Sequence, residues 1–214
     1  MDITINNGSS IQVVGPSGAG KSLFVSTLLS TRNYFKNPIQ HIYWHMGVEE
    51  ESGMTNTHMK KLKNITYIKG IDSNFTKKLK KHDVIVIDDL YDDVNSIKNF
   101  NDLFTKISRH NEITVIFITQ NLFHQGGKHR TRNLNVQYLV IFKNPRDQTV
   151  IDFLSRQAFP LNRKFLIDAF NDATSKPHGY LFLDFTQKCQ DEIRVRSDIF
   201  DIKNGIIIYK QKSL

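Results

Sequence analysis

Cysteine is almost absent from this chain, and so is any pattern of metal ligands. Cys189 is the only cysteine, which excludes an internal disulfide and a cluster of thiolates around a metal ion. This fits a reducing compartment. The eight histidines show no ligand-like spacing, so we expect no structural metal. The fold must therefore be stabilised mainly by a hydrophobic core.

Long hydrophobic runs are also missing. The longest apolar stretches are far shorter than the ~20 residues that a membrane-spanning helix needs, and the first residues, 1–6, are too polar for a signal peptide. We therefore expect a soluble, intracellular protein with no membrane partner. The 214 residues contain no repeats or low-complexity linker. They predict a single domain, with a core at about 10–160 and a C-terminal extension at about 161–214.

Acidic residues are scarce relative to basic ones. The chain has 21 Asp and Glu against 29 Lys and Arg, a net charge of +8. A positive potential of this kind favours a polyanionic partner such as nucleic acid. A Lys-rich proteome whose solvated protein surfaces happen to be basic explains the same composition equally well. The charge alone does not decide between these two interpretations.

Apolar runs alternate with segments of helical spacing, which predicts an α/β fold with a mostly parallel central sheet flanked by helices. In the helix expected to start at Lys21, four residues should share one face: Leu23, Phe24, Thr27 and Leu28. We expect core strands at 11–14, 41–45, 65–68, 84–87, 113–118 and 136–142. We expect helices at 21–30 and 95–109, followed by one or two helices at roughly 148–158 and 162–173. A short antiparallel C-terminal extension is expected from 179–183 and 205–209.

A phosphate-binding loop follows the first expected strand. The pattern G-x-x-x-x-G-K-[ST] is met in full, with one additional glycine. Glycines let backbone N–H groups turn toward phosphate oxygens, while Lys21 reaches the β- and γ-phosphates and the Ser22 hydroxyl ligates Mg²⁺. A chance match in a Gly/Ser-rich turn is the alternative. The candidate nucleotide-binding residues are Gly15, Pro16, Ser17, Gly18, Ala19, Gly20, Lys21 and Ser22.

Polar residues follow two further buried strands. Asp88 and Asp89 come directly after the strand at 84–87, where a carboxylate can hold the Mg²⁺ shell and a second acid can polarise the attacking water. We assign Asp88 to the metal and Asp89 to the water; alternatively Asp89 is only a turn or helix-cap residue. Gln120 ends the next strand and could contact the γ-phosphate, or be an ordinary polar residue at a strand end.

Two longer stretches of sequence indicate a resemblance to a specific family of P-loop proteins. Residues 118–126 (ITQNLFHQG) and 138–147 (YLVIFKNPRD), read together with the nucleotide motifs, resemble the viral genome-packaging ATPases of the FtsK/HerA P-loop superfamily. These include vaccinia-type, Polinton and virophage enzymes. The resemblance implies a RecA-like sheet in which the strand ending at Gln120 lies between those of the phosphate loop and Asp88. One departure is Asp89, where FtsK and HerA carry Glu.

The resemblance also implies partners and an activity. Such proteins form homo-oligomeric rings, pentamers or hexamers, that hydrolyse ATP with Mg²⁺ and pull double-stranded DNA into a preformed capsid. A capsid or portal-vertex protein is then the docking partner, at viral assembly sites in the host cell or in the virion. ATP is expected from the resemblance, and no N-K-x-D motif for a guanine base is present.

The resemblance further implies that a neighbouring subunit supplies an arginine for phosphoryl transfer. Arg109, Arg130, Arg132 and Arg146 are the candidates, and sequence alone does not choose among them, although Arg109 and Arg146 border core strands. In the basic loop at 123–132, Lys128, Arg130 and Arg132 are candidates for contacting DNA phosphates. A solvated loop, or one that contacts the next subunit, is the alternative.

Three other functions fit parts of the sequence. A DNA helicase or transfer motor of the same superfamily would share all the nucleotide motifs, although such proteins usually carry extra domains. A small-molecule P-loop kinase fits the length, and the loop at 130–132 weakly resembles its Arg-rich lid. A nucleotide-binding regulatory subunit with little turnover is favoured if Asp89 cannot act.

Overall fold

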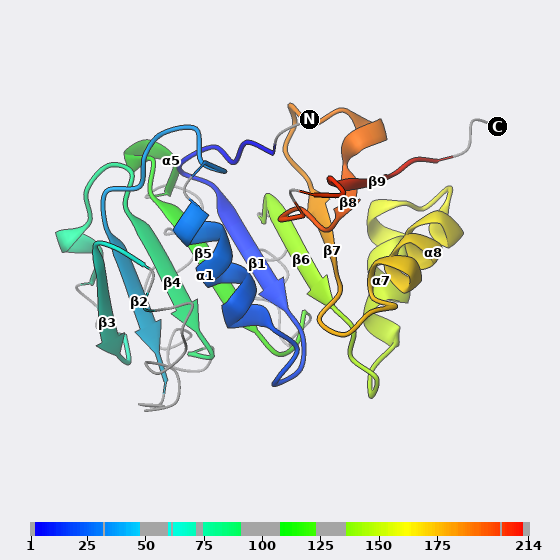
Figure 1. The fold of residues 1–214 in the computed structure, drawn as a ribbon, viewed down its shortest axis with the longest axis horizontal. Coiled ribbons are helices and arrows are strands. Elements are labelled where there is room, and N and C mark those ends of the chain that lie inside the picture. Colours follow the sequence, from blue (N-terminus) through cyan, green and yellow to red (C-terminus); the bar gives the residue numbers. More distant parts are fainter. Residues whose placement is uncertain are drawn as a thin grey trace.

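A computed structural model of the chain describes residues 3–31, 33–47, 60, 62–71, 75–90, 108–122, 136–201 and 203–211, with only the backbone at 109–110. Within these residues, one nine-stranded sheet runs through the molecule in the order β3-β2-β4-β5-β1-β6-β7-β8-β9 (Figure 1). The strands are β1 (Ser10–Val14), β2 (Ile42–Met46), β3 (Ile65–Lys69), β4 (Val84–Asp88), β5 (Thr114–Thr119), β6 (Tyr138–Phe142), β7 (Tyr180–Asp184), β8 (Val195–Ser197) and β9 (Ile207–Tyr209).

The first six strands are all parallel. Their runs of Val and Ile are buried on both faces, as parallel strands covered by other elements on both sides require. β5 lies between β1 and β4, as the sequence resemblance implied. The prediction of a RecA-like α/β fold is therefore confirmed, and the expected strands are displaced by no more than two residues at their ends.

Helix α1 (Lys21–Thr31) covers one face of the sheet (Figure 1). Its buried apolar residues lie at i, i+1, i+4 and i+5: Phe24, Val25, Leu28 and Leu29. The predicted apolar face was wrong by one position, because Leu23 is 36% exposed. Phe24 and Leu28 pack in the same cluster as Val13 of β1. Packing against the sheet thus fixes the start of α1, and with it the phosphate loop.

Helices α7 (Thr149–Ala158) and α8 (Arg163–Ala173) cover the other face. Side chains alternate across a strand, so β6 sends Val140 toward α1 and Leu139 and Ile141 toward α8. Leu166 and Phe170 of α8 close this second cluster. The expected helix at 95–109 lies outside the described residues except at its end, where α5 (Ser108–Asn111) is helical.

The antiparallel extension is present and longer than expected. β7 returns beside β6, and β8 and β9 add two further antiparallel strands. The sequence did not predict β8, which has only three residues and carries Arg196 in its middle. No helix among the described residues is long and apolar enough to cross a membrane.

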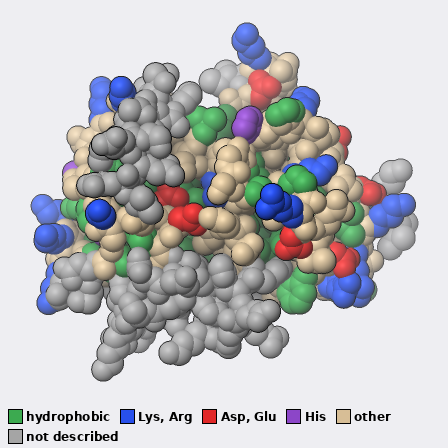
Figure 2. All heavy atoms as spheres, turned by 90° about the horizontal axis from the view of Figure 1, so that it is seen from below, with side chains coloured by type: hydrophobic (Ala, Val, Ile, Leu, Met, Phe, Trp, Pro, Cys, Tyr) green, Lys and Arg blue, Asp and Glu red, His purple; other side chains and the backbone are tan. Residues whose placement is uncertain are grey.

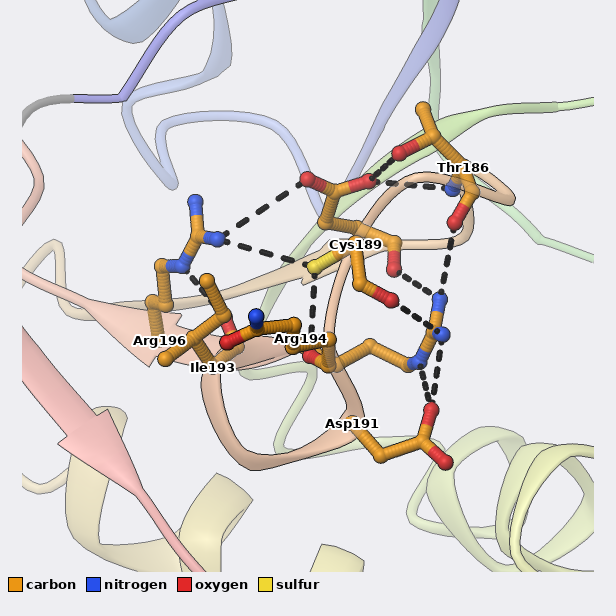
Figure 3. A network of polar contacts seen from close by, with 8 residues as sticks. Thr186, Cys189, Asp191, Ile193, Arg194 and Arg196 are labelled. Atoms are coloured by element: carbon orange, nitrogen blue, oxygen red, sulfur yellow. Dashed lines mark hydrogen bonds and ion pairs between the residues drawn. The ribbon is translucent and has the colours of Figure 1, made fainter.

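Two arginines, Arg194 and Arg196, contact the connection between β7 and β8, which contains the short 3-10 helix η4 (Asp191–Ile193) (Figure 3). The Arg194 guanidinium donates to the carbonyl oxygens of Asp184 at 2.6 Å, Thr186 at 3.3 Å and Cys189 at 3.0 Å. It also pairs with the Asp191 carboxylate at 2.8 Å. Its side chain is 18% exposed, so these contacts are partly shielded from water. A single side chain therefore satisfies three carbonyl groups of this connection and pairs with one of its carboxylates.

Arg194→Ala is expected to lower the free energy of unfolding by about 1–3 kcal/mol, because several carbonyl groups lose a charged donor. Chemical denaturation followed by circular dichroism measures the change. Lys188→Ala, an exposed lysine in the same connection, is the control and should alter stability by less than about 0.5 kcal/mol. Equal stability of the two variants would show that the Arg194 contacts contribute nothing net.

Candidate nucleotide site

The phosphate loop joins β1 to α1 at the edge where the parallel strands end. Gly18 and Gly20 have φ of +77° and +105°, values that side-chain-bearing residues rarely adopt. A Cβ on Gly15 would lie 2.7 Å from Cβ of Phe142, so β6 packs directly against the start of the loop. The glycines that the motif requires are thus required by this backbone as well.

Lys21 is buried beneath the loop. Its Nζ donates to the carbonyl oxygens of Gly15 at 2.7 Å and Pro16 at 3.0 Å. Burial lowers the pKa of this lysine, while the nearby carboxylates of Asp89 and Asp88 act in the opposite direction. The ammonium group therefore lies inside the loop, beside two acidic groups, where an added phosphate would offset its loss of hydration.

Asp88 is the last residue of β4, and one of its oxygens accepts two hydrogen bonds. Ser22 Oγ donates to Asp88 Oδ2 at 3.3 Å, and Trp44 Nε1 donates to the same atom at 3.2 Å. Burial raises the pKa of Asp88 to about 6, against the lowering effect of both hydrogen bonds and of Lys21. Asp88 is thus joined to the phosphate loop through Ser22. The sequence suggested that these two residues act together, but it did not show this contact.

The Trp44 contact was missed by the sequence reasoning. Trp44 lies on β2 and is fully buried, and its strand neighbours β4 in parallel register, with Trp44 opposite Val86. The strand order is needed to see this, because the two residues lie 44 positions apart. Trp44 and Ser22 thus together restrain the orientation of the Asp88 carboxylate.

The donor atoms here fit a magnesium ion. Mg²⁺ prefers hard oxygen ligands and usually takes only one or two from the protein. The Ser22 hydroxyl and the Asp88 carboxylate lie 3.3 Å apart, at the first turn of α1. Burial disfavours the charged form of Asp88, and a nearby divalent cation would favour it. These two side chains would hold the ion against the phosphates.

Asp89 and Gln120 form a direct pair. Gln120 Nε2 donates to Asp89 Oδ2 at 2.8 Å, and both side chains are exposed at the carboxyl end of the sheet. Asp89 has φ of +54°, a left-handed conformation that Asp tolerates better than most residues. Its backbone N–H donates to the carbonyl of Ile118 at 3.3 Å. The turn after β4 therefore aims this carboxylate at the end of β5.

The carboxyl ends of the parallel strands carry acidic side chains, among them Asp88 and Asp89 at the end of β4. Figure 2 shows this edge of the sheet, with acidic side chains near its middle. A cavity of about 190 Å³ opens beside the phosphate loop. Its lining includes Gly15, Gln120, Asn121, Lys143, Asn144 and Asp147. Both stretches of sequence that carried the family resemblance therefore contribute residues to this cavity next to Gly15.

The structure places the predicted functional arginines and lysines in different parts of the molecule. Arg146 is exposed, and its backbone N–H donates to Asn144 Oδ1 at 3.0 Å in the turn beside the cavity. The structure does not bring Arg109 to the phosphate loop: α5 contacts Gly8, before the start of β1, at the opposite edge of the sheet. Lys128, Arg130 and Arg132 lie outside the described residues.

A glycine-rich loop between β1 and α1, followed by a strand order with β5 between β1 and β4, defines the P-loop NTPase class with a RecA-like sheet. Within that class the chain belongs to the family described as RNA helicase, whose sequence pattern matches residues 11–132, more than half of the chain.

Solved structures share this fold over the whole chain. The DNA-packaging ATPase B204 of Sulfolobus turreted icosahedral virus is 14% identical, with a TM-score of 0.60 over 98% of this chain and 100% of that one. The genome packaging NTPase B204 of Sulfolobus turreted icosahedral virus 2, in complex with ATPγS, is 15% identical, with a TM-score of 0.55 over 96% of this chain and 98% of that one. The resemblance to viral packaging ATPases is thereby confirmed for the fold. No curated protein matches the chain in sequence.

Proposed function

We propose that this protein is an ATP-hydrolysing motor that moves double-stranded DNA into a viral capsid. The observation that carries the proposal is the Asp89–Gln120 pair, which lies at the end of a sheet with the phosphate loop and Asp88. A likeness in fold to a viral DNA-packaging ATPase over the full chain supports it. Because β7 to β9 continue the same sheet, we propose that residues 1–214 work as one ATPase domain.

Each side chain of the site has a role in this reaction. Backbone N–H groups of residues 15–20 and the Lys21 ammonium would bind the phosphates, with Ser22 and Asp88 holding Mg²⁺. When bound, the ion would supply positive charge that offsets the negative charge of the phosphates. Asp89 would accept the proton of the attacking water as the P–O bond to the leaving ADP breaks. Gln120 donates to Asp89 in the structure and would position that water or the γ-phosphate.

Coupling to DNA would begin at the same strand end. Gln120 is followed by Asn121, which also lines the cavity, and then by the basic segment at 123–135. A change at the γ-phosphate would reach Gln120 first and pass along the backbone to that segment. Lys128, Arg130 and Arg132 belong to it, and we propose that they contact DNA phosphates without reading sequence.

We propose that the protein acts as a pentameric or hexameric ring docked on a capsid or portal-vertex protein, and that Arg146 acts on the neighbour's nucleotide. Arg146 is exposed in a turn that also lines the cavity beside the phosphate loop, where a second subunit could reach it. Arg109, on the opposite edge of the sheet, is the weaker candidate.

Arg146→Ala is expected to lower ATP turnover by about 10³-fold while ATPγS affinity stays within a few fold, because a transition-state charge loses its partner. Turnover by phosphate release and affinity by calorimetry measure the two effects. Arg163→Ala, at the exposed start of α8, is the control. Full activity of Arg146→Ala would exclude this arginine as the one acting in trans.

A second candidate function is a helicase that separates nucleic-acid strands. The family to which residues 11–132 belong is described as RNA helicase, and the nucleotide site would be the same. The two proposals differ in substrate: intact duplex DNA for the packaging motor, and RNA or partly single-stranded nucleic acid for the helicase.

The experiment that separates them measures ATP turnover with long double-stranded DNA, single-stranded DNA, double-stranded RNA and single-stranded RNA. The packaging motor predicts that double-stranded DNA stimulates turnover most, and that Lys21→Ala abolishes the stimulated rate. Stimulation of turnover by RNA, together with no stimulation by double-stranded DNA, would favour the helicase. Phosphate transfer to a nucleoside monophosphate, with all nucleic acids inert, would overturn both.

The only tryptophan of the chain provides a direct test of the metal site. Because Trp44 Nε1 donates to Asp88 Oδ2, Mg²⁺ binding at Asp88 should change the indole environment and shift the fluorescence emission. We expect a larger change with Mg²⁺ and ATPγS than with ATPγS in EDTA. Asp88→Asn should remove the Mg²⁺-dependent part. An emission spectrum that ignores Mg²⁺ in the presence of bound ATPγS would contradict this assignment.

A further inference from the structure

A turn from the C-terminal extension contacts the phosphate loop. His178 lies in the connection between α8 and β7, and its Nδ1 is 3.1 Å from the carbonyl oxygen of Ala19, 159 residues earlier in the chain. Figure 1 shows this connection descending to the edge of the sheet where β1 ends. Because a carbonyl oxygen only accepts hydrogen bonds, Nδ1 must carry the proton and donate it.

The turn is built to hold this position. At the end of α8, Thr174 Oγ1 donates to the carbonyl of Phe170 at 2.7 Å. Further on, the Gly179 N–H donates to the carbonyl of Lys176 at 3.0 Å. A Cβ on Gly179 would lie 2.3 Å from the carbonyl oxygen of Ala173, so only glycine fits there. His178 itself has φ of +60°, a conformation that most residues avoid. The imidazole is therefore presented by a closely packed backbone.

The contact bears on the phosphate cradle through peptide geometry. In a trans peptide the C=O and the following N–H point in opposite directions. The Ala19 carbonyl and the Gly20 N–H belong to one such peptide, so holding the carbonyl outward toward His178 aims the N–H toward the inside of the loop. The imidazole also packs on this peptide, because a Cβ on Gly20 would lie 3.3 Å from His178 Nδ1.

This peptide needs to be held in place. Gly20 has φ of +105° and no side chain, so rotation of the Ala19–Gly20 peptide meets little steric resistance. A rotated peptide would direct a carbonyl oxygen, rather than an N–H, at the phosphates, and would repel them. Preorganised donors bind better because their ordering cost is met before the ligand arrives.

We propose that His178 is a positioning residue of the nucleotide site: its hydrogen bond to Ala19 fixes the Ala19–Gly20 peptide with its N–H toward the phosphates. The C-terminal extension thus completes the phosphate loop. The inference rests on the proposed nucleotide-binding function. It concerns affinity for the phosphate groups and adds no group to the chemical step.

Three substitutions at His178 separate the hydrogen bond from the backbone. His178→Asn keeps a side-chain N–H donor on a residue that tolerates positive φ. His178→Gly tolerates the same backbone and has no donor. His178→Asp matches Asn in size, yet its carboxylate cannot donate and would repel both the Ala19 carbonyl and a phosphate. Affinity for ATPγS by calorimetry and the melting temperature of each variant are measured.

We expect His178→Gly to weaken ATPγS binding by about tenfold. This corresponds to losing roughly one hydrogen bond, from the Gly20 N–H to a charged phosphate. His178→Asp should bind more weakly still, whereas His178→Asn should stay within about threefold of the wild type. Equal affinity in the wild type and His178→Gly, or no recovery in His178→Asn relative to His178→Gly, would overturn the inference alone. Failure of the wild type itself to bind ATPγS would overturn the proposed function and the inference with it.

Discussion

Replacing Lys21 with alanine is expected to lower ATP turnover by at least about 10²–10³-fold. The Lys21 ammonium lies inside the phosphate loop, where it donates to the carbonyl oxygens of Gly15 and Pro16. With ATP bound it would exchange these partners for β- and γ-phosphate oxygens and stabilise the charge that develops in the transition state. The variant also leaves two acidic groups, Asp88 and Asp89, without their nearby positive charge, so affinity for ATPγS should fall too.

Phosphate release and ATPγS calorimetry measure both effects. Lys77→Ala is the matched control, because Lys77 is exposed in η2 (Phe75–Lys78), a 3-10 helix before β4, and should leave both quantities unchanged. A Lys21→Ala protein that turns over ATP at the wild-type rate would place any ATPase activity elsewhere in the preparation or in the molecule.

Asp89→Asn is expected to reduce turnover by about 10²–10⁴-fold, the range for removing a general base, with ATPγS affinity within a few fold of the wild type. Asparagine tolerates the φ of +54° at this position, and its amide oxygen can still accept from Gln120. The substitution therefore removes the basic carboxylate while keeping the geometry. The measured quantities are turnover at saturating ATP and ATPγS affinity by calorimetry.

Asp168→Asn, on the exposed side of α8, is the control for loss of one negative charge and should be silent. If Asp89→Asn keeps full turnover, Asp89 is only a turn residue. Little ATP turnover by the wild type itself would instead favour the alternative of a nucleotide-binding regulatory subunit.

Much of the fold could be predicted because its signals are local. The runs at 84–87 and 113–118 are β-branched and continuous, which is typical of strands covered on both faces, and both became central parallel strands. The two helices after Asn144 have nearly the expected ends. Leu23 was misplaced because α1 contacts the sheet along a face centred one position later.

The site could be predicted only in part, since its remaining contacts join distant segments. The residues of the phosphate loop, together with Asp88, Asp89 and Gln120, follow strand ends, and that placement is readable from the sequence. Two contacts, Trp44 with Asp88 and His178 with Ala19, depend on strand order and on a turn in the extension. No local pattern marks either residue.

The most direct test of the central claim is a triplex-displacement assay on linear double-stranded DNA. A translocating motor displaces a bound third strand as it moves and leaves the duplex intact. We expect ATP-dependent displacement by the wild type, none by Lys21→Ala, and no separation of the duplex strands. Strand separation, or no displacement while ATP is being hydrolysed, would contradict a duplex-DNA translocase.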